Sequence, residues 1–303
     1  MASASILTQY GDPEVLEWRE VPRLEPGPGQ IRIAVRAAGV GPTDLKIRRG
    51  DLQAIFALPE PAVLGFEAGG VVDAVGADVE GVAVGDEVAA WLPGLGGYGE
   101  YVLASSWTPK PAGVSWEDAA ALPASAEAAV GVLRELGIQA GETLLVLGGG
   151  GAVGMIATQL AVRQGVSVLA AVGAADDATM EHLGARPVRY GDELGDTVRA
   201  AVDRVDAVLD AAGRGGLPTA IELAGGTQRV ITLADEHARD LGVRLSAPTP
   251  DRAPDGVAIA MALLGAGELQ LRSHQTFAMR DAAEAHRTLE RGQTGAKLVL
   301  TTG

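Results

Sequence analysis

Residues 143–163 read TLLVLGGGGAVGMIATQLAVR, which is a short apolar run, four glycines and an amphipathic segment. The run Leu144–Leu147 has the length of a buried strand. The apolar residues that share one face of the following helix are Val153, Ile156, Ala157 and Leu160. The glycines in GxGxxG register, which permit a tight turn, close approach of the backbone to a pyrophosphate and close packing of helix on strand, are Gly149, Gly151 and Gly154. The stretch therefore predicts a strand, a turn and a helix whose N-terminus faces an anion.

Strands and helices continue to alternate after this stretch. A glycine run alone is also typical of a flexible linker, but here a second strand, Val166–Val172, follows at the spacing of a βαβ unit. Further helices are expected at 176–183, 196–202 and 217–224, and further strands at 187–190, 205–210 and 229–233. Such alternation predicts a doubly wound parallel sheet, a Rossmann dinucleotide-binding domain, over residues 123–269.

The first 122 residues have a different pattern, with short runs between prolines and glycines. After a turn signal at 26–29, the segment Gln30–Arg36 alternates strictly, which predicts a half-solvated strand with Arg32 and Arg36 on its polar face. Further short strands are expected at 70–74, 87–91 and 100–104, so this part predicts a small antiparallel barrel or sandwich. A helical pattern begins at Ser115 with a break at Pro123, and the C-terminal part predicts helices at 255–265 and 281–290 and a strand at 297–301.

Composition limits the classes of partner. The 303 residues suffice for about two domains. Lys and Arg number 24 against 39 Asp and Glu, and the net charge of −15 disfavours nucleic acids and anionic membranes. The sequence has no cysteine, which excludes disulfides and thiolate metal sites. It has no signal-like leader and no run approaching the roughly 20 apolar residues of a membrane span. We therefore expect a cytoplasmic protein with no nucleic-acid or membrane partner.

Several motifs occur in one order along nearly the whole chain. They are AAGVGPTDLKIRRG at 37–50, LGFEAGGVVDAVG at 64–76, VGDEV at 84–88, YGEY at 98–101, ALP at 121–123, the glycine turn, DAAG at 210–213 and AKLVL at 296–300. In these motifs the chain resembles zinc-free medium-chain dehydrogenases/reductases of the quinone oxidoreductase, or zeta-crystallin-like, group.

The resemblance implies an α/β protein with two domains. A GroES-like antiparallel β domain, residues 1–122 completed by 270–303, would pack against the Rossmann domain, with the active site in the cleft. It also implies a homodimer in which the strand near residues 243–246 pairs with its copy and so covers an open sheet edge.

A metal site is not expected. Zinc needs three or four Cys, His or carboxylate ligands. The zinc-using relatives carry a His where this chain has Phe66 and a Cys where it has Gly41. The four histidines, at positions 182, 237, 274 and 286, lack paired ligand spacing and are interpreted as partly exposed helix or loop residues.

The end of the second strand indicates NADP(H) as the cofactor. An NAD-specific enzyme usually places an acidic residue there, whereas residues 171–174 are neutral and small. Asp176 and Asp177 replace the lysine that the resemblance implies, so the 2′-phosphate would need Arg189 with Tyr190, or Arg186; both arginines are equally consistent with surface charges. By the resemblance, the cofactor-binding residues are Gly149, Gly151, Ala152, Val153, Gly154, Gly173, Arg189, Tyr190, Gly213, Leu233, Ala234 and Lys297.

The candidate catalytic residues are Thr43, Asp44 and Glu127. By resemblance, Thr43 matches a proton-relay hydroxyl, while its alternative role is structural, as a hydroxyl in an apolar barrel. Asp44 is also typical of a turn or helix cap, and Glu127 is a proton donor only if buried, since Glu is usually exposed. The candidate substrate pocket is Gly41, Phe56, Phe66 and Trp91, where the three aromatic residues either form a wall or pack in the core. Gly41 and Ala128 replace a usual Asn and Thr.

Together these features predict an NADPH-dependent oxidoreductase. It would transfer hydride to a quinone or an α,β-unsaturated carbonyl, with the electrons supplied by the cofactor and the geometry by the protein. Alcohol dehydrogenation is disfavoured because no metal polarises the alcohol. The alternative is a non-catalytic NADPH-binding protein, such as a redox sensor or a crystallin-like structural protein.

Overall fold

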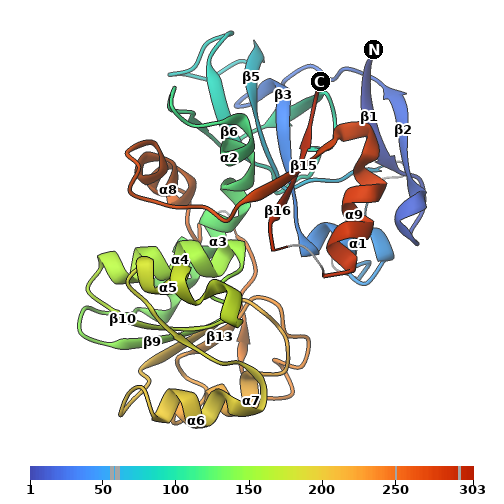
Figure 1. Ribbon diagram of the computed structural model, residues 1–303. Helices are drawn as coiled ribbons and strands as arrows, with labels where there is room; N and C mark the ends of the chain where they lie inside the picture. The colour runs from blue at the N-terminus through green and yellow to red at the C-terminus, as the bar shows by residue number, and fades with distance from the viewer. Residues whose placement is uncertain (55–57, 59–61, 250, 293–294) are drawn as a thin grey trace. The chain divides into compact units, whose positions relative to one another are not determined.

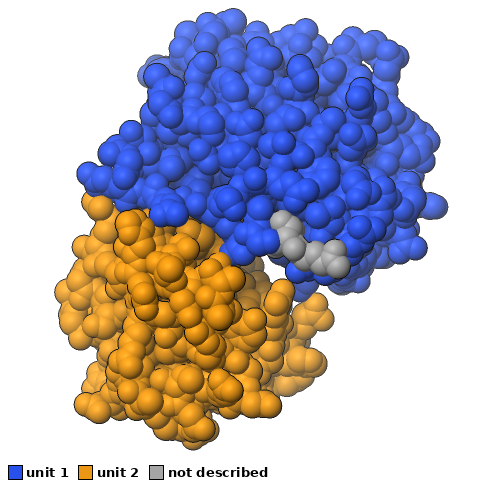
Figure 2. Space-filling model, in the orientation of Figure 1, with its two compact units in different colours: residues 1–124, 257–303 blue, residues 125–256 orange. Residues whose placement is uncertain are grey.

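The computed structural model describes residues 1–54, 58, 62–249, 251–292 and 295–303. They form two compact units (Figure 2). Unit 1 is residues 1–124 with 257–303, and unit 2 is residues 125–256. From the sequence we expected a GroES-like domain of residues 1–122 with 270–303 and a Rossmann domain of residues 123–269. These domain assignments remain predictions.

Unit 2 is built on a six-stranded sheet in which each neighbouring pair is parallel. The strand order is β11-β10-β9-β12-β13-β14. The strands are β9 (Thr143–Leu147), β10 (Ser167–Ala171), β11 (Arg186–Val188), β12 (Ala207–Asp210), β13 (Val230–Thr232) and β14 (Arg244–Leu245). The order reverses direction at β9, which makes the sheet doubly wound as predicted.

Helices cover both faces of this sheet (Figure 1). They are α4 (Ala152–Arg163), α5 (Asp177–His182), α6 (Leu194–Arg199) and α7 (Leu217–Ala224), while α3 (Pro123–Leu136) leads into the unit. Leu145 and Leu147 of β9 lie in one core cluster with Val198 of α6 and Ala220 of α7. Because strand residues point alternately to opposite faces, buried Leu144 points to the other face. A strand that is apolar on both sides therefore suits only this sandwiched position.

Unit 1 contains two sheets. The larger sheet has the order β15-β16-β3-β5-β6-β8, with β7 also paired to β3, and the smaller has the order β2-β1-β4. Its strands are β1 (Ala2–Leu7), β2 (Leu16–Val21), β3 (Ile31–Val40), β4 (Ala62–Val63), β5 (Glu67–Val75), β6 (Glu87–Trp91), β7 (Tyr101–Ala104), β8 (Trp107–Pro109), β15 (His274–Ala278) and β16 (Lys297–Thr301). All pairs are antiparallel except β15 with β16. The predicted α/β class and antiparallel β domain are confirmed.

Strand β3 differs from the half-solvated strand expected. Arg32, placed on its polar face from the sequence, is buried. Its Nε donates to Asp73 Oδ1 at 2.8 Å, and its Nη1 donates to the carbonyl of Leu24 and to Glu25 Oε1, both at 2.8 Å. A guanidinium with this set of acceptors is stable away from water. The expectation of a solvated Arg32 was therefore wrong.

The helices of unit 1 begin and end at recognisable signals. They are α1 (Pro42–Arg49), α2 (Trp116–Ala121), α8 (Gly256–Gly265, whose first residue belongs to unit 2) and α9 (Ala282–Glu290). Short 3₁₀ turns occur in unit 1 at Pro13–Val15 and Met279–Asp281, and in unit 2 at Ala174–Asp176 and Gly191–Glu193. Ser115 caps α2 by accepting from the Asp118 N–H at 3.0 Å. The break at Pro123 is confirmed, since α3 starts there. None of the helices described here is long and apolar enough to cross a membrane.

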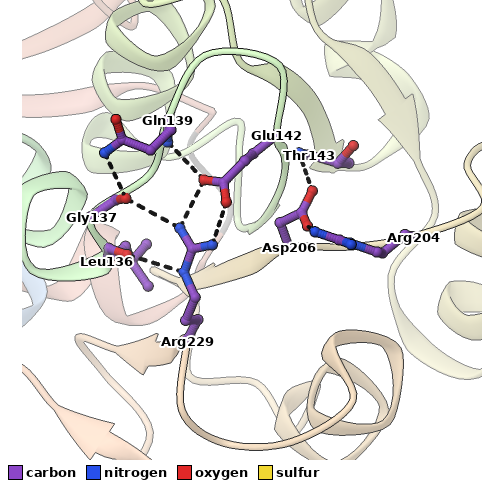
Figure 3. Close-up of polar contacts among 8 residues, drawn as sticks. All are labelled: Leu136, Gly137, Gln139, Glu142, Thr143, Arg204, Asp206 and Arg229. Atoms are coloured by element: carbon purple, nitrogen blue, oxygen red, sulfur yellow. Dashed lines mark hydrogen bonds and ion pairs between the residues drawn. The ribbon is translucent and has the colours of Figure 1, made fainter.

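A polar network joins the amino ends of the unit 2 strands (Figure 3). Arg229, before β13, pairs with both oxygens of Glu142 at 2.6 and 2.9 Å and donates to the carbonyls of Leu136 and Gly137 at the end of α3. The hydrogen bonds from Arg229 lower the pKa of Glu142 to about 2. This network ties helix to sheet at the edge opposite the strand carboxyl ends, so we assign it a structural role.

Candidate cofactor and substrate site

The predicted cofactor residues of unit 2 follow the carboxyl ends of neighbouring strands. In the register of the sheet, Leu147 lies beside Ala171 and Asp210, Ala171 lies beside Val188, and Asp210 lies beside Thr232. The segments that come directly after these strand ends are 148–154, 173, 189–190, 213 and 233–234. Because all strands run in one direction, these segments line the same edge of the sheet, where open α/β sheets bind ligands.

Two positions of the glycine turn, Gly149 and Gly154, leave no room for a side chain. A Cβ on Gly149 would lie 2.7 Å from Ala170 Cβ, and one on Gly154 would lie 2.2 Å from the Gly148 carbonyl oxygen. Gly148, with φ of +83°, makes the sharp turn, and Gly151 is the N-cap of α4. A bare backbone at the start of a twelve-residue helix, with first-turn N–H groups from Ala152 and Val153, fits a pyrophosphate.

Asp210 holds two of these segments in place. Its Oδ1 accepts from the backbone N–H groups of Ala212 and Gly213, both at 3.0 Å, and its Oδ2 accepts from Thr232 Oγ1 at 2.8 Å. Thr232 Oγ1 in turn accepts from Ala234 N at 3.1 Å. Both side chains are buried. This buried pair therefore fixes the loop after β12 against the loop after β13, next to the glycine turn.

The two arginines proposed to bind the 2′-phosphate have other partners. Arg189 forms a two-pronged ion pair with Asp177, with Nη1 donating to Oδ1 at 2.7 Å. Arg186 donates to the carbonyl of Ala201 at 2.7 Å. Tyr190 is 62% exposed, and its hydroxyl lies 3.5 Å from where a Cβ on Gly173 would be. Arg189 and Tyr190 thus lie beside the end of β10, and the guanidinium of Arg189 is paired with the carboxylate of Asp177.

In unit 1 the described substrate-pocket candidates, Gly41, Phe66 and Trp91, lie at one end of the larger sheet. Gly41 follows β3, and Lys297 begins β16, which runs beside it with Leu298 opposite Val40. Glu67 of β5 lies opposite Trp91 of β6 and follows half-buried Phe66. The Lys297 Nζ is 2.6 Å from Glu67 Oε1, so this cationic candidate for the cofactor already has a buried carboxylate partner.

Asp44 is a buried cap of α1. Its Oδ2 accepts from the Gly41 N–H at 2.8 Å and its Oδ1 from the Gly65 N–H at 3.1 Å. The interpretation as a cap carboxylate is confirmed. Burial raises the pKa of Asp44 to about 6, an effect that the Gly41 hydrogen bond and the Lys297 charge oppose. Asp44 therefore positions the two loops that carry Gly41 and Phe66.

Thr43 is an exposed residue in the first turn of α1. The alternative that it is a structural hydroxyl in an apolar barrel was wrong, because its side chain faces solvent. Its role as a donor to substrate stays a prediction. Phe56 lies outside the described residues.

Glu127 is buried, whereas a glutamate is usually exposed, and its carboxylate is paired with Arg252. Arg252 donates from Nε to Glu127 Oε1 at 2.9 Å and from Nη2 to Oε2, and its Nη1 donates to Ser246 Oγ at 2.8 Å. Gly131 leaves room for this guanidinium, since a Cβ there would lie 2.6 Å from Arg252 Nε. Both carboxylate oxygens of Glu127 therefore accept hydrogen bonds from one buried guanidinium. This geometry argues against Glu127 as a proton donor.

Comparisons with known proteins agree with this architecture. A family model described as the alcohol dehydrogenase GroES-like domain matches residues 27–111, and one described as zinc-binding dehydrogenase matches residues 183–300. A quinone oxidoreductase of Pseudomonas aeruginosa is 29% identical over 99% of both chains. The chain belongs to the medium-chain dehydrogenase/reductase family. The predicted likeness to its quinone oxidoreductase group is confirmed.

Other members of this family are also similar along the chain. A 2-haloacrylate reductase of Burkholderia is 28% identical over 99% of both chains, and a 2-methylene-furan-3-one reductase of Solanum lycopersicum is 32% identical over 74% of this chain and 61% of its own. Among solved structures, a Coxiella burnetii quinone oxidoreductase is 28% identical with a TM-score of 0.85, covering 100% of this chain and 99% of its own. An NAD-dependent alcohol dehydrogenase (29%, TM-score 0.85, 99% and 100% coverage) and a mycobacterial protein in complex with NADPH (26%, 0.85, 99% and 99%) match as well.

The positions at which the resemblance implies zinc ligands carry no ligating side chain in this chain. They are Gly41 and Phe66. Among the residues that the structure describes, there is no group of three or more His, Cys, Asp or Glu that could hold a metal ion. The donor set at this place in the family fold therefore does not fit zinc.

Sequence reasoning missed a buried polar cluster in unit 1. His286 of α9, expected to be partly exposed, is fully buried, and its Nε2 lies 3.1 Å from the Tyr98 hydroxyl. Burial, with the charges of Arg48 and Arg49, lowers the pKa of His286 to about 3. Arg48, also buried, pairs with Glu290 at the end of α9. Tyr98 and His286 are 188 residues apart, so no local pattern in the sequence could pair them. The YGEY motif, which begins with Tyr98, was the one feature of the sequence that drew attention to this place.

The buried histidine predicts a pH-dependent stability. The pKa of His286 is lower in the folded protein, so unfolding takes up a proton and the protein loses stability as the pH falls from about 6.5 toward 3. Asp44 acts in the opposite sense: its pKa is raised on folding from 3.8 to about 6, so it adds stability as the pH falls through that range. We expect His286→Gln to gain about 1 kcal/mol of unfolding free energy per pH unit relative to wild type between pH 6 and 4. Urea titrations at several pH values measure this. Exposed His182→Gln is the control, and an equal offset at every pH for His286→Gln would contradict a neutral, buried His286.

Proposed function

We propose that this protein is an NADPH-dependent reductase that transfers hydride to a quinone or an α,β-unsaturated carbonyl without a metal. The observation that carries the proposal is the row of loops at the carboxyl edge of the unit 2 sheet, centred on a glycine turn with no room for a Cβ at Gly154. That row fits a dinucleotide. Hydride transfer is the chemistry that a nicotinamide cofactor supplies when bound.

Relatives support the class of acceptor. The names of the three similar enzymes denote reduction of a quinone, a 2-haloacrylate and a 2-methylene-furan-3-one. Each acceptor has a carbon–carbon double bond conjugated to a carbonyl group. Hydride addition to such a system spreads the developing negative charge, so a weak hydrogen-bond donor suffices where a simple ketone needs strong polarisation. A site with Gly41 and Phe66 in place of zinc ligands is consistent with this requirement.

NADPH is the proposed cofactor because the end of β10 carries no acidic side chain. Residues 171–174 are small and neutral, whereas an NAD-specific site usually holds a carboxylate there. The mycobacterial relative was solved with NADPH, and another relative is named as NAD-dependent, so the family contains both uses. The preference of this chain therefore rests on its own residues around Gly173.

The chain's residues divide the work in this proposal. The turn 148–154 binds the pyrophosphate, and Asp210 with Thr232 fixes the neighbouring loops. Asp44 positions the loops of Gly41 and Phe66, and the exposed Thr43 hydroxyl donates a hydrogen bond to the acceptor oxygen as charge develops on it. Such a bond, tighter in the transition state than before, lowers the barrier.

Removal of the Thr43 hydroxyl tests this assignment. We expect Thr43→Val to lower kcat about tenfold to a hundredfold, since a lost transition-state hydrogen bond is worth roughly 1 to 3 kcal/mol, while NADPH affinity stays near wild type. Thr43→Ser keeps a hydroxyl and should retain most of the rate. An unchanged kcat in Thr43→Val would assign proton delivery to solvent and leave Thr43 without a catalytic role.

Steady-state assays test the proposed function as a whole. NADPH and NADH oxidation would be followed with a panel of benzoquinones, naphthoquinones and enones, before and after treatment with a chelator, with metal content measured by elemental analysis. We expect turnover with NADPH and conjugated acceptors, no stoichiometric zinc and no effect of the chelator. Tight NADPH binding without turnover of any acceptor would instead favour a non-catalytic NADPH-binding protein.

We also propose a homodimer through the edge of the unit 2 sheet. Strand β14 ends the sheet order, and both its residues are exposed, with Leu245 at 53%. No other strand of the described residues pairs with the outer edge of β14, and such an edge with an exposed leucine is suited to pairing with its own copy. We expect light scattering at micromolar concentration to give twice the chain mass for wild type and a monomer mass for Leu245→Glu. The control is Val84→Glu, which changes a residue of unit 1 that is 65% exposed and should also give twice the chain mass. A monomeric wild type would contradict the proposal.

A further inference from the structure

Asp177 and Arg189 form an ion pair at the edge of the unit 2 sheet where the adenosine ribose of the proposed dinucleotide would bind. Val188 lies opposite Ala171 in the parallel register, so Arg189 comes directly after β11, beside the end of β10. Asp177 is the first residue of α5, which follows β10. Arg189 Nη1 donates to Asp177 Oδ1 at 2.7 Å, and Nη2 donates to Oδ2.

The pair covers the face of Arg189 that a phosphate would use. A guanidinium binds carboxylates and phosphates through the same fork of two parallel N–H groups, and here the two terminal nitrogens face one carboxylate. The side chains are 37% and 30% exposed, so the pair is at the surface and open to exchange of its anion. The bonds to Arg189 also lower the pKa of Asp177, so the carboxylate is ionised at neutral pH.

Other residues near the end of β10 do not take over this role. Arg186 points to the carbonyl of Ala201, which lies just after α6. Gly173 has no side chain, and the Tyr190 hydroxyl lies within 3.5 Å of the space that a side chain there would occupy. Arg189 is therefore the cation best placed for a 2′-phosphate, and Asp177 competes for it.

We propose that Asp177 sets the cofactor selectivity by competing with the 2′-phosphate of NADPH for Arg189. The inference rests on the proposed function, in that it assumes that an NADP(H) or NAD(H) dinucleotide binds at this edge. The 2′-phosphate of NADPH has to displace the Asp177 carboxylate from Arg189, and the two negative charges then lie close together. NADH has no 2′-phosphate and leaves the ion pair intact. Asp177 thus holds the preference for NADPH below the level that Arg189 alone would give.

Binding titrations on the full-length protein test the competition without any need for turnover. Fluorescence titration would give Kd for NADPH and for NADH in wild type, Asp177→Asn, Arg189→Ala and the double variant. The matched control is Asp176→Asn, which removes the same charge one position earlier. We expect Asp177→Asn to tighten NADPH binding about tenfold, because the 2′-phosphate no longer has to displace a carboxylate from Arg189 or lie beside its charge. NADH binding should change less than twofold.

The double variant separates competition from a general charge effect. If Asp177 acts through Arg189, the gain should vanish in the Arg189→Ala background, and Asp176→Asn should give a much smaller gain. Equal tightening of NADPH and NADH, or a gain that survives without Arg189, would overturn the inference while the proposed reaction stands. Selective tightening in a protein that reduces no acceptor would support the inference and contradict the proposed reaction. Binding of neither nucleotide would overturn both.

Discussion

Replacing Gly154 with valine is expected to raise the Kd for NADPH by about a hundredfold or more. The first atom of any side chain at this position would lie 2.2 Å from the Gly148 oxygen and 2.8 Å from the Gly149 Cα. Both neighbours are backbone atoms of the glycine turn, so the helix must move away from the strand to admit a side chain. That movement displaces the helix N-terminus from the pyrophosphate it is proposed to bind. Fluorescence titration with NADPH measures the effect.

Gly113→Val is the control for this substitution. Gly113 is exposed and has open space around the position of a Cβ, so valine there should leave both stability and NADPH affinity near wild type. Circular dichroism of each variant shows whether the fold survives, and Gly154→Ala gives a smaller perturbation if valine prevents folding. Wild-type affinity in a folded Gly154→Val protein would show that the cofactor does not bind at this turn.

The largest loss of stability is expected from Arg252→Ala. Arg252 and Glu127 have side chains that are only 4% and 3% exposed. Removal of the guanidinium leaves a buried carboxylate without its partner, and such a change costs about 3 to 5 kcal/mol. The Ser246 hydroxyl also loses its donor. Urea denaturation followed by circular dichroism measures the change.

Arg134, on the same helix as Glu127, provides a matched comparison for Arg252. Arg134 pairs with Asp255 at 2.6 Å, but its side chain is 45% exposed and that of Asp255 is 54% exposed. Water replaces this partner when Arg134 is truncated, so Arg134→Ala should cost about 0 to 1 kcal/mol. Equal losses for the two variants would show that the Glu127–Arg252 pair is solvated and would reopen the role of Glu127 as a proton donor.

The regular part of the fold could be predicted from local patterns. Leu144–Leu147 is apolar on both faces, which only a covered parallel strand satisfies, and the observed β9 differs by one residue. The last strand, Lys297–Thr301, has the predicted bounds. Helix α1 was not predicted, although Pro42 at its first position, Asp44 at its third and Gly50 with φ of +90° just after it are ordinary boundary signals. Eight residues are too few to show a helical period.

The polar interior could not be predicted because its partners are distant in the sequence. Glu127 and Arg252 are 125 residues apart, and Arg32 and Asp73 are 41 apart. A single charged residue in a sequence is expected to be solvated, and only the fold shows that a partner with matching geometry is at hand.

The candidate site divides in the same way. The glycine turn was predictable, because the need for glycine arises from contacts within a few residues, such as Gly154 with Gly148. The anion partner of Arg189 was not, since the sequence placed Asp177 near the cofactor but gave no register between β10 and β11. Asp210 belongs to the DAAG motif, yet its hydrogen bond to Thr232 depends on two strands being neighbours in the sheet.

Transfer of a labelled hydride tests the central claim most directly. The protein would be mixed with NADPH deuterated at the transferring C4 position and with a simple cyclic enone, and the product would be examined by mass spectrometry and NMR. The account predicts a saturated ketone with one deuterium on the former β-carbon, and loss of this product in Gly154→Val. Binding of NADPH with no reduced product from any quinone or enone would contradict it.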